Sequence, residues 1–382
     1  MLFFFLFQGR LSSFVDGGVS VSHLIRTFWF GMLLFVFFQA SVVGCGGEPV
    51  DTESPQESSI QDAGGEQNAT VDAGDEQAQT EKTQGTEDTQ GVDATGDPNQ
   101  VFLEMADPVN CKAGQITEYA KQTALKRVND IRKIHGLAPV EYNTALDKDV
   151  MEAALIIVAN STITHYPKAS AACYSEAANN GSGKSNIGIK ISSSDSPPDM
   201  ASVSDKIDGW LRDDRNVQPG VGHRRWILNP FLKHVAFGYA YGKSPNPTKP
   251  GLPYVTGSAL YVLESKTNIS TISEGFVAYP YKEYPKGLWN KDTYLSFSVF
   301  YDGKSTFSNK EVDFSNANIE VKSSSKAMTV SGKTSNTKGS GLPNVMIWKV
   351  EGLQSDVKYD VSITKVMVKG QEKDYSYSFT LK

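Results

Sequence analysis

The chain has 382 residues and a formal net charge of −6, which averages over unlike parts. Residues 46–100 contain 14 acidic residues against a single basic one, Lys82, so this stretch carries −13 and residues 101–382 carry +6. The basic residues of the later part are scattered rather than gathered in a stripe, which argues against a nucleic-acid-binding protein. A chain of this length has room for two or three domains.

Residues 1–45 have the pattern of an export signal. Arg26 precedes an apolar run over residues 28–38, and small residues lead to Cys45. A basic flank, a short apolar core and small residues before a cleavage site are typical of a secretory signal peptide. Residues 42–45, Val-Val-Gly-Cys, resemble a bacterial lipobox, in which Cys45 is lipidated and becomes the mature N-terminus. An uncleaved membrane anchor is the alternative, and either form holds an exported chain at a membrane.

The residue after Cys45 bears on which membrane that is. Gly46 stands where an Asp would favour retention at the inner membrane of a Gram-negative cell. We therefore expect an outer-membrane location if the host is Gram-negative. Residues 46–107 consist mainly of Glu, Asp, Gln, Thr, Gly and Ala, and this composition predicts a disordered acidic linker because it offers too little apolar surface to bury.

Two cysteines remain, Cys111 and Cys173. In an oxidising compartment the remaining cysteines of an exported protein usually pair, so we expect a disulfide between them. Reactive free thiols are the alternative, but neither cysteine has a CxxC partner or an evident activating neighbour.

Helices are predicted first along the folded part. Apolar residues at three- and four-residue intervals indicate an amphipathic helix over residues 116–135, which Gly136 ends. A second, more apolar helix is predicted over 146–160, and a third over 198–210, with Pro198 at its start. Strands follow over 235–241 and 259–263. Helices over a short strand set predict an α+β domain.

After residue 273 the apolar period changes to two, over residues 295–301, 357–363 and 375–381. Regular strands separated by Gly, Asn and Ser turns predict an all-β sandwich over residues 273–382. Tyr359, which follows Gly352-Leu353, resembles the tyrosine corner of immunoglobulin and fibronectin type III-like domains.

The most specific motif is the run from Gly222 to Pro230, Gly-His-Arg-Arg-Trp-Ile-Leu-Asn-Pro. It resembles the late histidine motif of bacterial CAP domains, the superfamily of cysteine-rich secretory proteins, antigen 5 and plant pathogenesis-related 1 proteins. Residues 128–140, with Asn129 and Arg132 before Gly136, are similar to the opening pattern of that family. The resemblance implies a CAP-type α-β-α sandwich at residues 108–266, followed by the immunoglobulin-like sandwich.

The resemblance also implies a cleft with two histidines and two acidic residues. The matching positions here are His165, Glu176, Asp213 and His223, with Asp213 in place of the family's Glu. Three of them, His165, Glu176 and His223, are the expected ligands of Zn²⁺ or another divalent cation, with one coordination position left open. Asp213, one methylene shorter than Glu, would reach the metal through water.

Other residues of these motifs are expected to support the fold. We expect His135 and His234 to be hydrogen-bonded structural residues, and Trp226, Ile227 and Leu228 to pack in the core. Arg224 and Arg225 are expected to pair with carboxylates or to stack on an aromatic ring.

Three functions remain open. The first is a binding or interaction module at the cell envelope, a monomer whose ligand is a small hydrophobic molecule, a peptide or envelope material. The second is a metal-assisted hydrolase of peptide or cell-wall material with Glu176 as base. No nucleophile motif, phosphate loop or HExxH supports an enzyme, and catalytic roles stay unassigned. The third is an adhesive surface protein whose β-sandwich binds the partner.

Overall fold

The computed structural model describes residues 97–214, 216, 220–263, 272, 274–337 and 339–382. These residues belong to one compact unit, Thr86–Lys382. The predicted leader, with Cys45, and most of the predicted linker lie outside them. Within the described part of the chain, no helix is both long enough and apolar enough to cross a membrane.

Residues 101–263 fold as helices around a small sheet, which we call the α-β-α part. Its helices are α1 (Glu118–Ile134), α2 (Asp147–Asn160), α3 (Glu176–Lys184), α4 (Met200–Arg212) and α5 (Gly222–Ile227), with a 3₁₀ turn at Thr144–Leu146. Its strands are β1 (Phe102–Glu104), β2 (Gln115–Ile116), β3 (Glu141–Tyr142), β4 (Ser185–Ser192), β5 (His234–Val235), β6 (Phe237–Lys243) and β7 (Tyr254–Tyr261).

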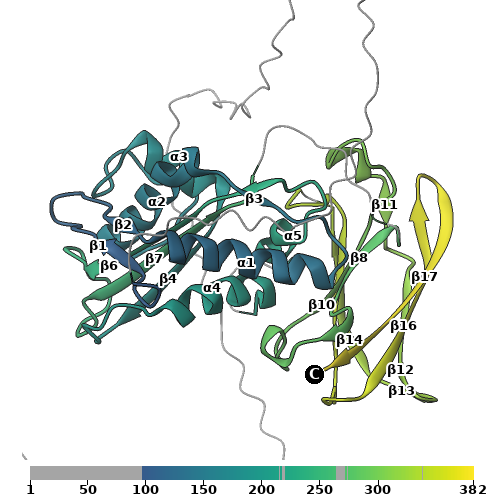
Figure 1. Cartoon of the computed structure of the whole chain (residues 1–382). Helices are drawn as coiled ribbons and strands as arrows, with labels where there is room; N and C mark the ends of the chain where they lie inside the picture. Colours follow the sequence, from purple (N-terminus) through teal and green to yellow (C-terminus); the bar gives the residue numbers. More distant parts are fainter. Residues whose placement is uncertain (1–96, 215, 217–219, 264–271, 273, 338) are drawn as a thin grey trace, which may run out of the picture. The chain divides into compact units, whose positions relative to one another are not determined.

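The central sheet has the antiparallel order β4-β7-β6, and helices cover both of its faces (Figure 1). Successive side chains of a strand point to opposite faces. In β6, Tyr239 belongs to the buried cluster that includes side chains of α1 and α4, whereas Ala240 belongs to a cluster with Ala154 and Val158 of α2. The predicted α-β-α arrangement and the α+β class are therefore confirmed.

Helix α1 forms as its sequence pattern predicts. Ala120, Ala124 and Val128 are fully buried along one stripe, and the Thr117 side chain caps the N-terminus by accepting from the Ala120 amide. On the partly exposed side, Arg127 donates two hydrogen bonds to Asp208 of α4, at 2.6 and 2.7 Å. Charge-assisted bidentate pairs of this kind fix geometry as well as adding stability.

Helix α2 is almost entirely buried and lies directly against the backbone of the sheet. A Cβ added to Gly238 of β6 would lie 2.1 Å from the Val150 carbonyl oxygen, and one added to Gly257 of β7 would lie 2.1 Å from that of Ala154. Only glycine allows this approach at either position. The two strands therefore hold α2 at backbone distance along two of its turns.

Residues 274–382 form a β-sandwich of two sheets. One has the order β14-β15-β10-β8 and the other β13-β12-β16-β17-β9, with β11 on β16. The strands are β8 (Phe276–Tyr279), β9 (Lys282–Tyr284), β10 (Leu295–Val299), β11 (Val312–Asp313), β12 (Asn318–Ser323), β13 (Lys326–Ala327), β14 (Val330–Asn336), β15 (Val345–Val350), β16 (Lys358–Val368) and β17 (Gln371–Leu381). Short 3₁₀ turns lie at Lys286–Leu288 and Phe307–Asn309.

The predicted tyrosine corner is present. The Tyr359 hydroxyl accepts a hydrogen bond from the backbone amide of Gln354 at 2.8 Å, five residues upstream. This backward bond is the mark of that corner in immunoglobulin-like sandwiches.

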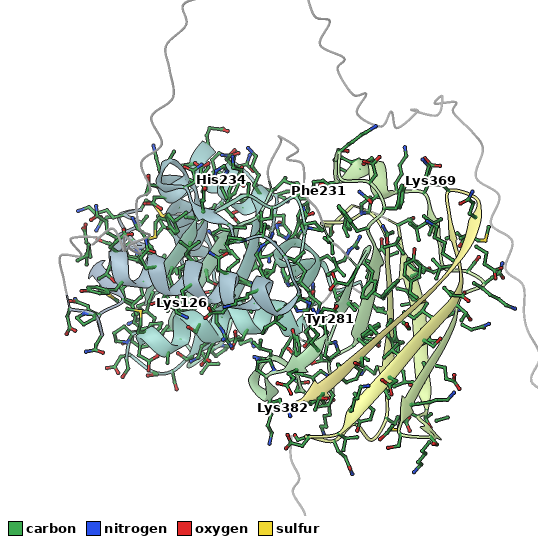
Figure 2. All side chains as sticks on the ribbon, turned by 45° about the vertical axis from the view of Figure 1, so that its right-hand side comes forward. Lys126, Phe231, His234, Tyr281, Lys369 and Lys382 are labelled. Carbon is green, nitrogen blue, oxygen red and sulfur yellow. A yellow bond between two sulfur atoms is a disulfide. The ribbon has the colours of Figure 1, made fainter. Side chains whose placement is uncertain are left out.

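A single cluster of buried side chains runs from α1 into the β-sandwich. Phe231 and Tyr281, labelled in Figure 2, belong to it: Phe231 contacts Phe300 at 5.7 Å between ring centroids, and Tyr281 stacks on His135 at 6.4 Å. The α-β-α part and the β-sandwich therefore share a core rather than meeting at a polar interface.

The structure differs from the sequence-based expectation at several elements. Strand β1 lies inside the predicted linker, and Val101 and Phe102 are buried, so the fold begins earlier than residue 108. Helix α4 starts at Met200 rather than Pro198, because the Asp199 side chain caps it by accepting from the Ser202 amide. Helices α3 and α5 and strand β4 had not been predicted.

Candidate functional site

His223 is the second residue of α5 and is held by Asp213, the residue that ends α4. Asp213 Oδ1 accepts from His223 Nδ1 at 2.8 Å, and Oδ2 accepts from the His223 backbone amide at 3.0 Å. The Asp213 side chain is 0% exposed and the His223 side chain 20% exposed. Because a carboxylate oxygen only accepts, Nδ1 carries a proton and Nε2 is the basic nitrogen of the neutral ring.

The backbone at Asp213 explains this arrangement. Asp213 has φ of 54°, in the left-handed region that aspartate tolerates better than most residues. This conformation ends α4 and turns the chain toward α5. The ring of Trp210 lies at 6.5 Å from that of His223, on a different side from Asp213, which accepts from Nδ1. The His223 imidazole is therefore fixed on more than one side.

His165 lies on the loop after α2, as predicted, and its side chain is exposed. Its Nδ1 lies 2.8 Å from the backbone carbonyl oxygen of Ser182, near the end of α3. A carbonyl oxygen only accepts, so His165 also donates through Nδ1 and leaves Nε2 as its basic nitrogen. Both predicted histidines thus have the same tautomer.

Glu176 is the first residue of α3 and is exposed, with Oε1 accepting from the Tyr174 hydroxyl at 3.3 Å. Ser182, to which His165 is bonded, lies six residues further along the same helix. At 1.5 Å per residue the two positions are about 9 Å apart along the helix axis. Glu176 therefore lies at the opposite end of α3 from the His165 contact.

The expected three-ligand metal site of His165, Glu176 and His223 is not assembled in this structure. No group of three or more His, Cys, Asp and Glu side chains in the described residues is placed to hold one metal ion. Both oxygens of Asp213, the remaining acidic candidate, are engaged by His223. The described side chains of this set therefore do not fit a metal ion.

Arg224 follows His223 and is completely buried. Its guanidinium lies 3.7 Å above the ring of Tyr279 and donates to the carbonyl oxygens of Leu211 and Arg212 at the end of α4. It also donates to the Tyr294 carbonyl oxygen and the Ser296 hydroxyl of the β-sandwich. Burial lowers the pKa of this guanidinium below its ordinary value. Of the two expectations for Arg224, stacking on an aromatic ring is the one observed.

Two further buried arginines also bind backbone. Arg132 of α1 donates to the carbonyl oxygens of Ile227 and Asn229, both in the Gly222–Pro230 run, and burial lowers its pKa to about 9. Arg225 donates to the Leu342 carbonyl oxygen, and burial lowers its pKa to about 10. Arg132 therefore joins α1 to the end of α5, and Arg224 and Arg225 join α5 to the β-sandwich.

The remaining residues of the motif and the other histidines have structural surroundings. Ile227 and Leu228 are buried, whereas Trp226 is partly buried against the same core. His135 is buried among tyrosines, with Nε2 at 3.3 Å from the Tyr284 hydroxyl. His234 lies 3.5 Å from the Glu141 carboxylate.

The disulfide between Cys111 and Cys173 is confirmed, with the two Cα atoms 5.1 Å apart. It ties the end of the loop that carries His165 to the segment before α1. The Asn160 side chain contributes there too, donating to the Ala172 carbonyl oxygen at 2.9 Å and accepting from the Ala172 amide at 3.0 Å. His165 is therefore presented on a loop with a fixed base.

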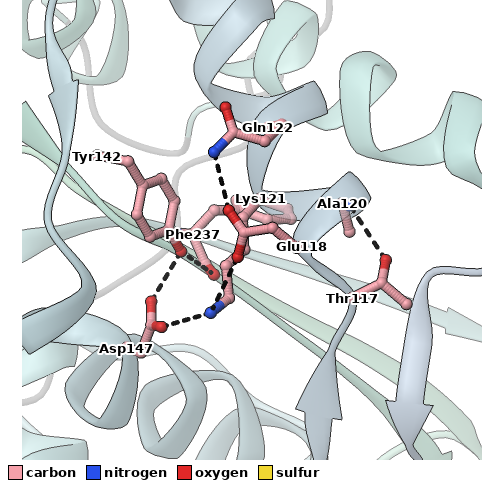
Figure 3. Close-up of polar contacts among 8 residues, drawn as sticks. All are labelled: Thr117, Glu118, Ala120, Lys121, Gln122, Tyr142, Asp147 and Phe237. Atoms are coloured by element: carbon pink, nitrogen blue, oxygen red, sulfur yellow. Dashed lines mark hydrogen bonds and ion pairs between the residues drawn. The ribbon is translucent and has the colours of Figure 1, made fainter. Parts of the chain in front are cut away.

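A hollow of about 690 Å³ lies elsewhere, between the β1–β2 hairpin and the first turns of α1 and α2. Figure 3 shows the polar network beside it: Lys121 Nζ lies 2.6 Å from Asp147 and 3.7 Å from Glu118, and the Tyr142 hydroxyl donates to Asp147 at 2.8 Å. The single ammonium and the two carboxylates leave this network with one net negative charge, and the network joins α1 to α2.

Comparison with known families agrees with this geometry. Residues 125–248 match the model of the CAP family, described as the cysteine-rich secretory protein family. The chain contains a CAP domain. A CAP domain indicates an extracellular binding or interaction module, and the match includes His165, Glu176, Asp213 and His223. A comparison with curated proteins finds no match.

Sequence reasoning missed the partners that orient the two histidines of the CAP domain. Asp213 was expected to reach a metal, and it instead holds His223 Nδ1. The sequence could not predict that Ser182 binds His165, because the hydrogen bond is made by the backbone carbonyl oxygen, which every residue has. A usable signal for Asp213 was its position directly after a predicted helix, where an aspartate suits the left-handed end.

Proposed function

We propose that this protein is an exported, lipid-anchored CAP-domain module that binds a ligand at the envelope through His223 and His165. The observation that carries the proposal is the Asp213–His223 pair, a buried carboxylate holding a partly exposed imidazole. Such a pair costs free energy to bury, and it leaves Nε2 as the basic nitrogen of a ring that is 20% exposed. A fixed imidazole nitrogen suits recognition of a hydroxyl, amide or carboxylate group.

The anchor rests on separate support. The lipobox-like residues 42–45 place Cys45 after an apolar run, and the Cys111–Cys173 disulfide is typical of proteins in an oxidising compartment. We expect Cys45→Ala to move the protein from the membrane fraction to the soluble envelope fraction. Retention of Cys45→Ala in the membrane fraction would contradict the lipid anchor and favour an uncleaved span.

Binding is tested with two probes, isolated cell-wall sacculi and labelled peptides. Wild-type protein, His223→Ala and His234→Ala are compared by co-sedimentation and by fluorescence anisotropy. His234 is the matched control, since its imidazole lies beside Glu141 and not beside Asp213. We expect His223→Ala to lose binding while His234→Ala keeps it. Equal binding by all three proteins to both probes would contradict a role for His223.

A second candidate, a hydrolase, is favoured by the same pair. A carboxylate that holds Nδ1–H orients the imidazole so that Nε2 can take a proton from water. Asp213 would then be a positioning residue and His223 the base, with no role for Glu176. This version requires hydrolysis of peptide or cell-wall substrate by wild-type protein and its loss in His223→Ala. Absence of turnover in the wild type leaves the binding module as the function.

A further inference from the structure

The exposed large apolar side chains are unevenly distributed over the described residues. They are Leu103, Met105, Val109, Ile163, Tyr166 and Phe307. All but Phe307 belong to two short segments, 103–109 and 163–166. Val109 is 70% exposed and Tyr166 83% exposed. Single exposed apolar residues need no explanation, but a concentration of them marks an interaction surface.

These two segments lie side by side because the disulfide joins them. Cys111 follows Val109 by two residues, and Cys173 lies in the closed base of the loop that carries Ile163 and Tyr166. The Cys173 sulfur also lies 3.3 Å from the Pro108 carbonyl oxygen. We call the five exposed side chains of these segments the apolar patch: Leu103, Met105, Val109, Ile163 and Tyr166.

A third segment, residues 243–251, flanks both of the others. The Ser244 hydroxyl donates to the Ala159 carbonyl oxygen at 3.2 Å, and the Thr248 hydroxyl donates to that of Ser161 at 3.1 Å, at the start of the His165 loop. On the other side, a Cβ on Gly242 would lie 3.3 Å from Pro108 Cδ. The three segments therefore form one surface.

The charges of this surface are mostly positive. Over residues 103–112, 163–173 and 243–251, which extend the first two segments past the disulfide, the exposed lysines are Lys112, Lys168, Lys243 and Lys249, and the acidic residues are Glu104 and Asp107. Asp107 is engaged locally: Asn110 donates to it from its side chain at 2.7 Å and from its backbone amide at 3.1 Å. Hydrogen bonds from Asn110 hold the pKa of Asp107 below its ordinary value, so it stays ionised.

We propose that the apolar patch and its lysines dock the protein onto an anionic lipid surface. Apolar side chains that enter the interface, ringed by lysines that attract anionic headgroups, are the pattern of peripheral membrane binding. A two-fold dimer through the same surface is disfavoured, because it would place each copy's lysines opposite those of the other. The acidic residues 46–100 repel such lipids, so docking depends on the lysines of the surface itself.

The position of the patch along the chain agrees with this partner, in a step that rests on the proposed lipid anchor. The described chain begins at Asp97, six residues before Leu103, and 51 residues separate Cys45 from Asp97. A chain of that length spans at most about 180 Å when fully extended. The anchor would therefore keep the patch within reach of the membrane, since the connecting chain enters the folded unit beside it.

The test uses the chain from Gly46 to Lys382, which lacks the leader and any acyl group but contains the whole compact unit. It is floated with phosphatidylcholine vesicles, with and without phosphatidylglycerol, at low and at high salt. We expect binding only to the vesicles with phosphatidylglycerol, and less of it at high salt. Tyr166→Ser and Val109→Asp should each weaken partitioning roughly ten-fold or more. Phe307→Ser is the matched control and should bind as the wild type does.

Several results would overturn the proposal. These are no binding to either vesicle, equal binding to both, an equal loss for Phe307→Ser, or a wild-type dimer that Val109→Asp dissociates. Exposed positions tolerate such changes, and an unchanged thermal midpoint confirms that each variant is folded. Because this chain carries no lipid, the result is independent of the Cys45→Ala fractionation, and failure of either test leaves the other standing.

Discussion

His223 and His165 are both oriented through Nδ1, but the two regions that hold them differ in kind. His223 lies on the short helix α5 and is bonded to the buried carboxylate of Asp213. The next residue, Arg224, is fixed by buried contacts to α4 and the β-sandwich. His165 is bonded to one backbone carbonyl and lies on an exposed loop whose end a disulfide ties to Cys111. One region is held by the core and the other by a covalent link.

The difference predicts that each region can lose its structure while the other keeps it. A change in the core beneath α5 should disturb His223 and leave the His165 loop in place, because that loop depends on its own base. Reduction of the disulfide should do the reverse. Four predictions test this division, beginning with the largest expected effect.

Arg224→Ala should lower the free energy of unfolding by about 4 kcal/mol, because it strands several buried acceptors and opens a cavity beside Tyr279. Urea denaturation measures this. Arg212→Ala is the matched control, since Arg212 makes an exposed bond to the Gly287 carbonyl oxygen and its loss should cost about 1 kcal/mol at most. Similar losses in both variants would show that α5 does not depend on its buried arginine.

The double variant Cys111→Ser/Cys173→Ser should lose about 4 kcal/mol, the contribution expected of a disulfide between cysteines 62 residues apart. Hydrogen exchange should become faster for amides of residues 161–172 and stay unchanged in α5. Reduction of the wild-type protein should give the same result. Faster exchange in α5 as well would contradict the separation of the two regions.

Acid should weaken the His223 region through His135, which stacks on the same Tyr279 that Arg224 covers. Burial lowers the pKa of His135 to about 3, against 6.5 for a free histidine. Between these two pH values, His135 binds a proton in the unfolded chain but not in the folded one. Stability from this residue is complete above pH 6.5 and is lost as the pH falls toward 3. The loss is about 2 kcal/mol at pH 5.

Urea denaturation at pH 8 and pH 5 measures this loss, with two histidine variants compared. His135→Phe should flatten the pH dependence, whereas His234→Gln should keep it. An unchanged slope in His135→Phe would assign the acid sensitivity to other groups.

Asp213→Asn should have the smallest effect on stability, about 1 kcal/mol, because the amide keeps one acceptor oxygen. Its main effect should be on the ring, since an amide can also donate to Nδ1 and so stabilise the other tautomer. Nitrogen NMR shifts of His223 report the tautomer, and those of His165 serve as the internal control. An unchanged His223 spectrum would show that Asp213 does not fix the ring.

The longer elements could be predicted from the sequence because their burial patterns are local. The α1 stripe and the period-two strands of the β-sandwich are visible in the residues themselves. Helix α5 is different: its six residues include two arginines, and it is held by acceptors as distant along the chain as Tyr294 and Leu342. Polar helix α3, with its glycines, likewise gives no periodic signal.

The sequence identified the two histidines of the site but not the groups that orient them. The family motif located His165 and His223, whereas the distance of Glu176 from His165 depends on α3, which the sequence did not reveal. The arginines illustrate the same limit. Buried cations are expected to face carboxylates, but Arg132 and Arg224 are satisfied by backbone oxygens, which any residue can provide.

The contact of Gly238 and Gly257 with α2 has a consequence for how the His165 loop tolerates change. Replacing glycine by alanine in a strand usually stabilises a protein, because the unfolded chain has fewer conformations to lose. At these two positions the new methyl group would push α2 off the sheet, and the end of α2 leads into the His165 loop. The sheet thus fixes the position of α2 and of the loop that follows it, so a methyl group added at Gly238 or Gly257 would move the His165 loop.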